Sequence, residues 1–216
     1  LPATLADFPT GRPVDAAATV FATEGVESVA VCLFNSFLDG AHERAAGERL
    51  ATSWAGKWIS LSSDVMPTMG EYERGSTAVV NAYVAPKVTS YLRALDEQLR
   101  QLGLPRPLLL LQSNGGAVSV AQVAARPVML VLSGPAAGVG ALKGCAAPGE
   151  PANLISMEIG GTSCDVMVMA RGEVPVADEL VIDGYHLTTP SVEIHTVGAG
   201  GGTIAWVDDA GLLHAG

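Results

Sequence analysis

Cysteine is scarce in this sequence, and long apolar runs are absent. The three cysteines, Cys32, Cys145 and Cys164, lie far apart and match neither a disulfide framework nor the ligand spacing of a zinc site. No stretch approaches the roughly 20 consecutive apolar residues that a membrane-spanning helix needs. Because a signal peptide is also absent, we expect a soluble, cytoplasmic protein without a membrane partner.

Positive charge is scarce as well. The 216 residues contain 12 Lys and Arg against 22 Asp and Glu, which gives a formal net charge of −10. Binding to nucleic acid rests on clustered Lys and Arg, so no nucleic-acid partner is expected. A single nucleotide is not excluded, because backbone N–H groups and a metal ion can hold its phosphates.

The first 61 residues alternate between helical and strand patterns. Helices are predicted over 13–24 and 41–54, and buried strands over 29–34 and 58–61. A β-α-β order of this kind implies a parallel sheet covered by helices, so the predicted fold class is α/β.

A long amphipathic helix is predicted over about 76–102. Apolar residues recur there at steps of three and four along one face, namely Val80, Val84, Val88, Tyr91, Leu95, Leu99 and Leu102. Pro86 lies inside this segment and is expected to kink the helix, because it removes one backbone donor and crowds the carbonyl of Ala82.

The rest of the chain changes character along its length. Strand, short helix, strand and second helix are expected in turn at 107–112, 120–125, 128–132 and about 133–146. A linker at 148–151 precedes strands that are joined by tight glycine turns, at 154–159, 164–170 and 174–177. We therefore expect two domains, 1–135 and 136–216.

A glycine turn with an acid at each end occupies residues 158–165 (EIGGTSCD). Backbone N–H groups of such a turn can approach an anion, and the candidate phosphate-binding residues are Gly160, Gly161, Thr162 and Ser163. Glu158 and Asp165 are candidates to hold Mg²⁺ or to orient an attacking water. The alternative is an ordinary hairpin turn with solvated acids.

A second glycine-rich loop precedes a predicted strand at 204–207. Its nucleotide-binding candidates are Gly198, Gly200, Gly201 and Gly202, and the alternative is a flexible connector. Strand alternation before this loop places Glu193 and His195 on one face, where they are a candidate metal ligand and a candidate catalytic group. A lone histidine is more often structural.

Polar residues also follow the predicted strand 107–112. Ser113 and Asn114 would lie at the end of a strand in a parallel sheet, where ligands collect in open α/β folds, although Asn-Gly is also plain turn chemistry. Nucleophile roles for Cys164 or Ser133 are disfavoured, because no base lies at an interpretable spacing.

Five blocks in one order resemble the hydantoinase A / 5-oxoprolinase family, which includes the acetone and acetophenone carboxylase subunits. The blocks are 71–74 with 81–84, 112–116, 132–138, 160–162 and 194–202. This resemblance implies an actin-like, ribonuclease H-like ATPase fold with mixed sheets flanked by helices and ATP between two domains. It also makes 133–138 the segment that connects the domains, with Gly134 as a further nucleotide-binding candidate.

Two departures from the family pattern shape the expectation. The family commonly has Asp where this chain has Glu158, and a small residue such as Thr where it has Cys164, so Asp165 is the leading ligand for metal or water. The family's first Asp-x-Gly-Gly-Thr hairpin does not occur in these residues. We therefore expect a fragment that needs the rest of its own chain and does not hydrolyse ATP alone.

The resemblance implies an enzyme that hydrolyses a cyclic amide such as a hydantoin or 5-oxoproline. Phosphorylation of the ring carbonyl by ATP, with Mg²⁺ or another divalent ion, would create a good leaving group. His195 would act as acid or base near that carbonyl, and a hydantoinase B-like subunit would be the partner. The alternatives are an ATP-dependent ketone carboxylase subunit and a non-catalytic nucleotide-binding module.

Overall fold

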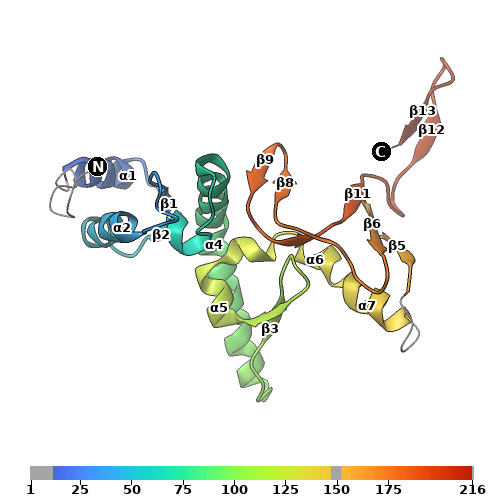
Figure 1. Ribbon diagram of the computed structural model, residues 1–216, viewed down its shortest axis with the longest axis horizontal. Coiled ribbons are helices and arrows are strands. Elements are labelled where there is room, and N and C mark those ends of the chain that lie inside the picture. The colour runs from blue at the N-terminus through green and yellow to red at the C-terminus, as the bar shows by residue number, and fades with distance from the viewer. Residues whose placement is uncertain (1–11, 147–151, 216) are drawn as a thin grey trace. The chain divides into compact units, whose positions relative to one another are not determined.

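The computed structural model describes residues 12–146 and 152–215 as a mixed α/β structure (Figure 1). The chain divides into two compact units. The first contains the described residues up to Leu110 with Val118–Val131 and Asp178–Thr189, and the second contains Leu111–Ala117, Leu132–Ala177 and the described residues from Pro190 onward. The predicted linker at 148–151 lies outside the described residues, and the division into domains 1–135 and 136–216 stays a prediction.

The first unit begins with the predicted β-α-β arrangement. Its elements are α1 (Arg12–Thr23), β1 (Ser28–Val31), α2 (Ala41–Ser53) and β2 (Trp58–Leu61). The two strands are parallel, and Ala18, Val29, Leu50 and Trp54 form the core between them and the helices. β1 ends three residues before the predicted end because the chain turns away around Asn35, which has a φ of 57°.

The short helix α3 (Ser62–Val65) leads to the long helix α4 (Glu71–Gln101), which contains Pro86 and remains continuous. The predicted apolar face of α4 is wrong in part, because Tyr91 and Leu102 are exposed. The buried positions are mostly small or polar instead, namely Arg74, Thr77, Ala78, Asn81, Ala82, Ala85, Thr89 and Leu92. Small side chains let α4 lie close against β1 and β2, so closeness of approach decides which face is buried. No helix in 12–146 or 152–215 is long and apolar enough to cross a bilayer.

The predicted helix over 120–125 is confirmed as α5 (Val120–Ala125), whose capping box joins Ser119 and Gln122. The strand predicted at 128–132 is wrong, because these residues begin in a 3₁₀ helix, η2 (Pro127–Leu130). The N–H of Val128 donates to Oδ1 of the buried Asn81 at 3.1 Å, which keeps this donor out of any sheet.

Two hairpins contribute further strands. In the first unit, β8 (Leu180–Ile182) pairs with β9 (Tyr185–Leu187). The second hairpin is β3 (Leu109–Leu111) with β4 (Ala117–Ser119). The expectation that 113–116 end a strand of a parallel sheet is therefore wrong, because they form the turn of this hairpin.

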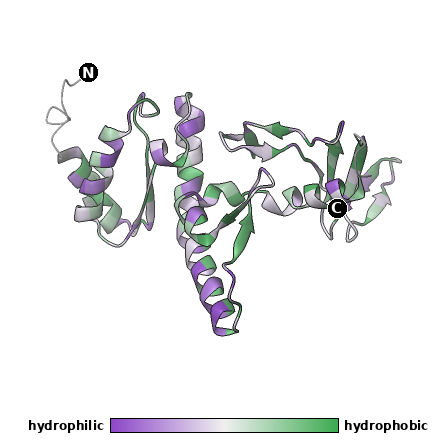
Figure 2. Cartoon of the chain, turned by 60° about the horizontal axis from the view of Figure 1, so that its bottom comes forward, coloured by the Kyte–Doolittle hydropathy of each residue, from purple (hydrophilic) through white to green (hydrophobic). Residues whose placement is uncertain are grey.

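In the second unit, helices α6 (Ser133–Ala136) and α7 (Gly138–Cys145) precede β5 (Leu154–Ile159), β6 (Cys164–Met169) and β11 (His195–Val197). These strands form an antiparallel sheet in the order β11-β6-β5. Two strand pairs complete the unit, β7 (Val176–Ala177) with β10 (Ser191–Val192) and β12 (Ala205–Val207) with β13 (Leu213–Ala215). Much of β5 and β6 is coloured hydrophobic in Figure 2, and one face of these strands packs Met167 and Met169 against Leu142 of α7.

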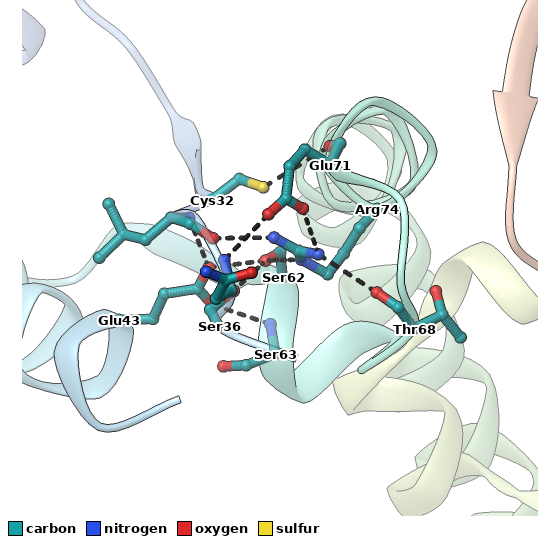
Figure 3. A network of polar contacts seen from close by, with 10 residues as sticks. Cys32, Ser36, Glu43, Ser62, Ser63, Thr68, Glu71 and Arg74 are labelled. Atoms are coloured by element: carbon teal, nitrogen blue, oxygen red, sulfur yellow. Dashed lines mark hydrogen bonds and ion pairs between the residues drawn. The ribbon is translucent and has the colours of Figure 1, made fainter. Parts of the chain in front are cut away.

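A polar network joins α4 to the segments that follow β1 and β2 (Figure 3). Its centre is Arg74, whose side chain is fully buried. The guanidinium donates to Ser62 Oγ at 3.0 Å, to the Leu33 carbonyl at 2.8 Å and to the Thr68 carbonyl at 3.2 Å, and it pairs with Glu71 at 2.7 Å. The guanidinium is therefore paired with one carboxylate and donates to three neutral acceptors.

Glu43 is the buried acid of the same network, and no cation of the described residues is its direct partner. Its carboxylate accepts hydrogen bonds from the Leu33 N–H at 2.8 Å, the Ser62 hydroxyl at 2.6 Å and the Ser63 N–H at 2.8 Å. Burial alone would raise the pKa of Glu43, but the hydrogen bonds outweigh it and hold the pKa below its usual value.

Replacement of Arg74 by Met is expected to destabilise the protein. The change removes the Arg74 guanidinium from Glu71, which keeps the Asn35 N–H as a donor. It also takes a donor from two part-buried carbonyls, and the loss is expected to cost about 1–3 kcal/mol. Urea unfolding followed by circular dichroism measures this loss. Arg93→Met, at an exposed position of the same helix, is the matched control and should change the unfolding free energy little. Equal effects of the two variants would contradict the role given to Arg74.

The free energy of unfolding is expected to depend on the ionisation of Glu43. Since its folded pKa lies below the ordinary value of 4.5, its contribution is complete above about pH 4.5 and is lost as the pH falls through the folded pKa. Glu43→Gln should lower stability at pH 7 and weaken its fall in acid. Denaturant unfolding over a pH series tests this, with the exposed Glu48→Gln on the same helix as control. An unchanged acid slope in Glu43→Gln would refute the assignment.

Candidate functional site

Two acidic residues lie directly opposite each other in the β5–β6 pair of the second unit. The register places Glu158 opposite Asp165, and β11 places Thr196 opposite Asp165 on its other side. Directly opposed residues of a sheet share one face, so Glu158, Asp165 and Thr196 form a row across three strands. The Thr196 hydroxyl donates to Asp165 Oδ1 at 2.6 Å.

The two predicted glycine loops lie against each other. The N–H of Gly201 donates to the Gly160 carbonyl at 2.8 Å, and the N–H of Gly202 donates to the Gly161 carbonyl at 2.7 Å. A Cβ added to Gly200 would lie 2.7 Å from both the Gly160 oxygen and the Ser163 nitrogen. Only glycine fits this contact, and the two loops therefore form one structural element.

Several backbone N–H groups of the turn between β5 and β6 make no hydrogen bond within the described residues. Gly160 uses its N–H in a bond to the Ser163 carbonyl at 2.8 Å. Within the parts of the chain that the structure describes, the N–H groups of Gly161, Thr162 and Ser163 have no acceptor. A side chain at position 200 would cover the Thr162 and Ser163 nitrogens, so the glycine there leaves donors that suit an anion.

Glu158 reaches the start of α7. A Cβ added to Gly138 would lie 1.6 Å from Glu158 Oε1 and 2.5 Å from the Met167 side chain. The glycine at the first position of α7 therefore makes room for the Glu158 carboxylate. A carboxylate is favourable at this end of a helix, where the dipole is positive.

The predicted catalytic residue His195 and the predicted metal ligand Glu193 lie elsewhere in the unit. His195 is opposite Val166, so it lies on the other face of the sheet from Asp165. Glu193 is exposed and precedes β11, and its N–H donates to the Pro175 carbonyl at 3.0 Å. Within 12–146 and 152–215, no three His, Cys, Asp or Glu residues gather as a metal site.

The remaining nucleotide-binding candidates lie in the β3–β4 turn and in α6. Ser113 is buried and its carbonyl accepts from the Val192 N–H at 2.8 Å, while Asn114 Oδ1 accepts from the Gly116 N–H at 2.8 Å. Gly134 is exposed on α6. The turn reaches α6 through Gly115, where an added Cβ would lie 3.9 Å from the Ala136 carbonyl. Their nucleotide roles stay predictions.

Thr196 and Gly138 are the residues of this site that sequence reasoning missed. Thr196 stands beside His195 in a block that the resemblance had already singled out, and strand alternation puts these two neighbours on opposite faces. The sequence does not say which face carries the acids, because that depends on the pairing of β6 with β11.

The fold and these loops place the chain among known proteins. Residues 74–216 match the family described as Hydantoinase/oxoprolinase, and the chain belongs to that family. Caprolactamase subunit alpha of Pseudomonas jessenii is 32% identical over 94% of this chain and 29% of its own length. The 5-oxoprolinase of Saccharomyces cerevisiae is 32% identical over 91% of this chain and 15% of its own length. The acetophenone carboxylase gamma subunit of Aromatoleum aromaticum is 29% identical over 87% of this chain and 26% of its own length.

Two solved structures resemble the chain. The crystal structure of the ATP-dependent caprolactamase from Pseudomonas jessenii superposes with a TM-score of 0.81 at 32% identity, over 94% of this chain and 29% of that chain. Nucleotide-free acetone carboxylase has a TM-score of 0.81 at 23% identity, over 96% of this chain and 30% of that chain. This match shows likeness of fold. The chain spans less than a third of the length of the relatives it matches.

Gly200→Ala is expected to separate the two glycine loops. The added methyl group would overlap backbone atoms at 2.7–2.8 Å, and relief of such overlap costs about 1–3 kcal/mol. Hydrogen exchange should then speed up at the N–H groups of Gly201 and Gly202. Gly198→Ala is the control, because its Cβ would meet no atom within 4 Å. The packing described here would be wrong if both variants exchanged alike.

Proposed function

We propose that this chain supplies part of the ATP site of an enzyme that opens a cyclic amide. The observation that carries the proposal is the contact of the two glycine loops next to the paired carboxylates Glu158 and Asp165. The relatives whose names include caprolactamase and 5-oxoprolinase support a cyclic amide as substrate class. An actin-like fold is part of the same proposal.

The backbone donors of the hairpin turn suit phosphate oxygens. The N–H groups of Gly161, Thr162 and Ser163 bind without reorganisation, because the turn is already fixed by the second glycine loop. ATP, when bound, supplies the phosphoryl group that turns a ring carbonyl oxygen into a leaving group. The chain's own part is to hold and orient phosphates at the turn.

The carboxylate pair suits a divalent cation. Like charges directly opposite in an antiparallel pair repel each other, and a cation removes that repulsion. Two protein carboxylates are too few for a site made by the protein alone, but Mg²⁺ is commonly bound by one or two carboxylates together with nucleotide phosphates. Glu158 and Asp165 would hold Mg²⁺ in this way.

A ketone carboxylase subunit is the second candidate. The match to the acetophenone carboxylase gamma subunit favours it, and the same phosphate site would serve a different acceptor. Relatives named as alpha and gamma subunits support a further subunit as partner in either case.

Asp165→Asn in the complete enzyme, with any partner subunit, is expected to slow ATP-dependent turnover at least ~100-fold, as when a transition state loses one electrostatic stabiliser. Phosphate release with lactams, hydantoins and ketones measures this loss. The exposed Asp178→Asn is the control.

The products separate the candidates. Ring-opened acid without incorporation of labelled bicarbonate supports the amidase, and fixed label supports the carboxylase. ATP binding without phosphate release on any of these compounds would instead indicate a non-catalytic nucleotide-binding module.

A further inference from the structure

Thr196 makes the one side-chain hydrogen bond that reaches the paired carboxylates within the described residues. Its Oγ1 donates to Asp165 Oδ1 at 2.6 Å, a length typical of a hydroxyl bonded to a charged oxygen. The bond joins residues that are directly opposite in the β6–β11 pair. It is therefore fixed by the sheet and not by a mobile loop.

The geometry leaves the two oxygens of Asp165 in different states. Oδ1 is engaged by Thr196, and Oδ2 has no hydrogen-bond partner in the described part of the chain. Threonine is β-branched and has restricted χ1 freedom in a strand, so its hydroxyl holds one direction. The carboxylate plane of Asp165 is thereby set by a rigid donor.

We propose that Thr196 is a positioning residue, which holds Oδ1 of Asp165 so that Oδ2 is presented as a single metal-binding oxygen beside Glu158. The inference rests on the proposed Mg²⁺ and ATP site. Donors that orient a metal-binding carboxylate commonly contribute 10–100-fold to metal affinity or activity. The contribution of Thr196 should lie in that range, and it should depend on the hydroxyl group.

The test compares metal binding in Thr196→Val and Thr196→Ser, made in the complete enzyme with any partner subunit. Mn²⁺ serves as the probe, and electron paramagnetic resonance measures its dissociation constant in the presence of a non-hydrolysable ATP analogue. Thr196→Val should raise this constant at least ~10-fold, and Thr196→Ser, which keeps the hydroxyl, should restore most of the affinity. Thr196→Ala takes the place of Thr196→Val if the latter does not fold.

Val168→Thr is the matched control for a threonine–valine exchange, because Val168 is half exposed on the other face of β6. An unchanged Mn²⁺ constant in Thr196→Val, or equal weakening in Thr196→Ser, would overturn the positioning role. Asp165→Asn separates this result from the proposed function. If Asp165→Asn binds Mn²⁺ as tightly as the parent enzyme, the proposed metal site is wrong. If Asp165→Asn binds Mn²⁺ weakly and Thr196→Val binds it normally, the metal site stands and only the positioning role of Thr196 is refuted.

Discussion

The antiparallel register of β5 and β6 is the constraint on which the candidate site depends. It sets Glu158 opposite Asp165, and a slip of one residue would send the acids to opposite faces of the sheet. Met167 and Met169 prevent such a slip. They lie two and four residues after Asp165, on the same face of β6, and are buried against α7. The core of the second unit thus fixes the position of its charges.

Two glycines allow other segments of the second unit to lie close against this pair of strands. Gly138 lets α7 begin directly against the Glu158 carboxylate, and Gly200 lets the second loop touch the hairpin turn. In both places an alanine methyl group would overlap atoms of the site. These glycines are therefore explained by close approach, and not by a need for positive φ.

Local patterns predicted the elements well where the pattern alone decides the structure. The helix at 120–125 and the strands at 58–61 and 154–159 were found because periodicity and turn residues mark them. Contacts between residues that are distant in the sequence decide the other elements. The Val128 N–H donates to Asn81 and not to a neighbouring strand. Close packing buries the face of α4 that carries small and polar residues, and not the predicted face with its valines. The glycine loops of the site were visible in the sequence, whereas the link from Thr196 to Asp165 required the strand pairing.

Two glutamates of this chain differ in the hydrogen-bond donors that surround them. Glu43 is buried, and its carboxylate accepts hydrogen bonds from two backbone N–H groups and a serine hydroxyl. Glu158 is half buried and lies opposite Asp165 in the β5–β6 register, with no donor to its carboxylate among the described residues. A carboxylate pair with so few donors is costly unless a cation completes it. The sheet register therefore places two acidic residues side by side, and the proposed cation would offset their repulsion.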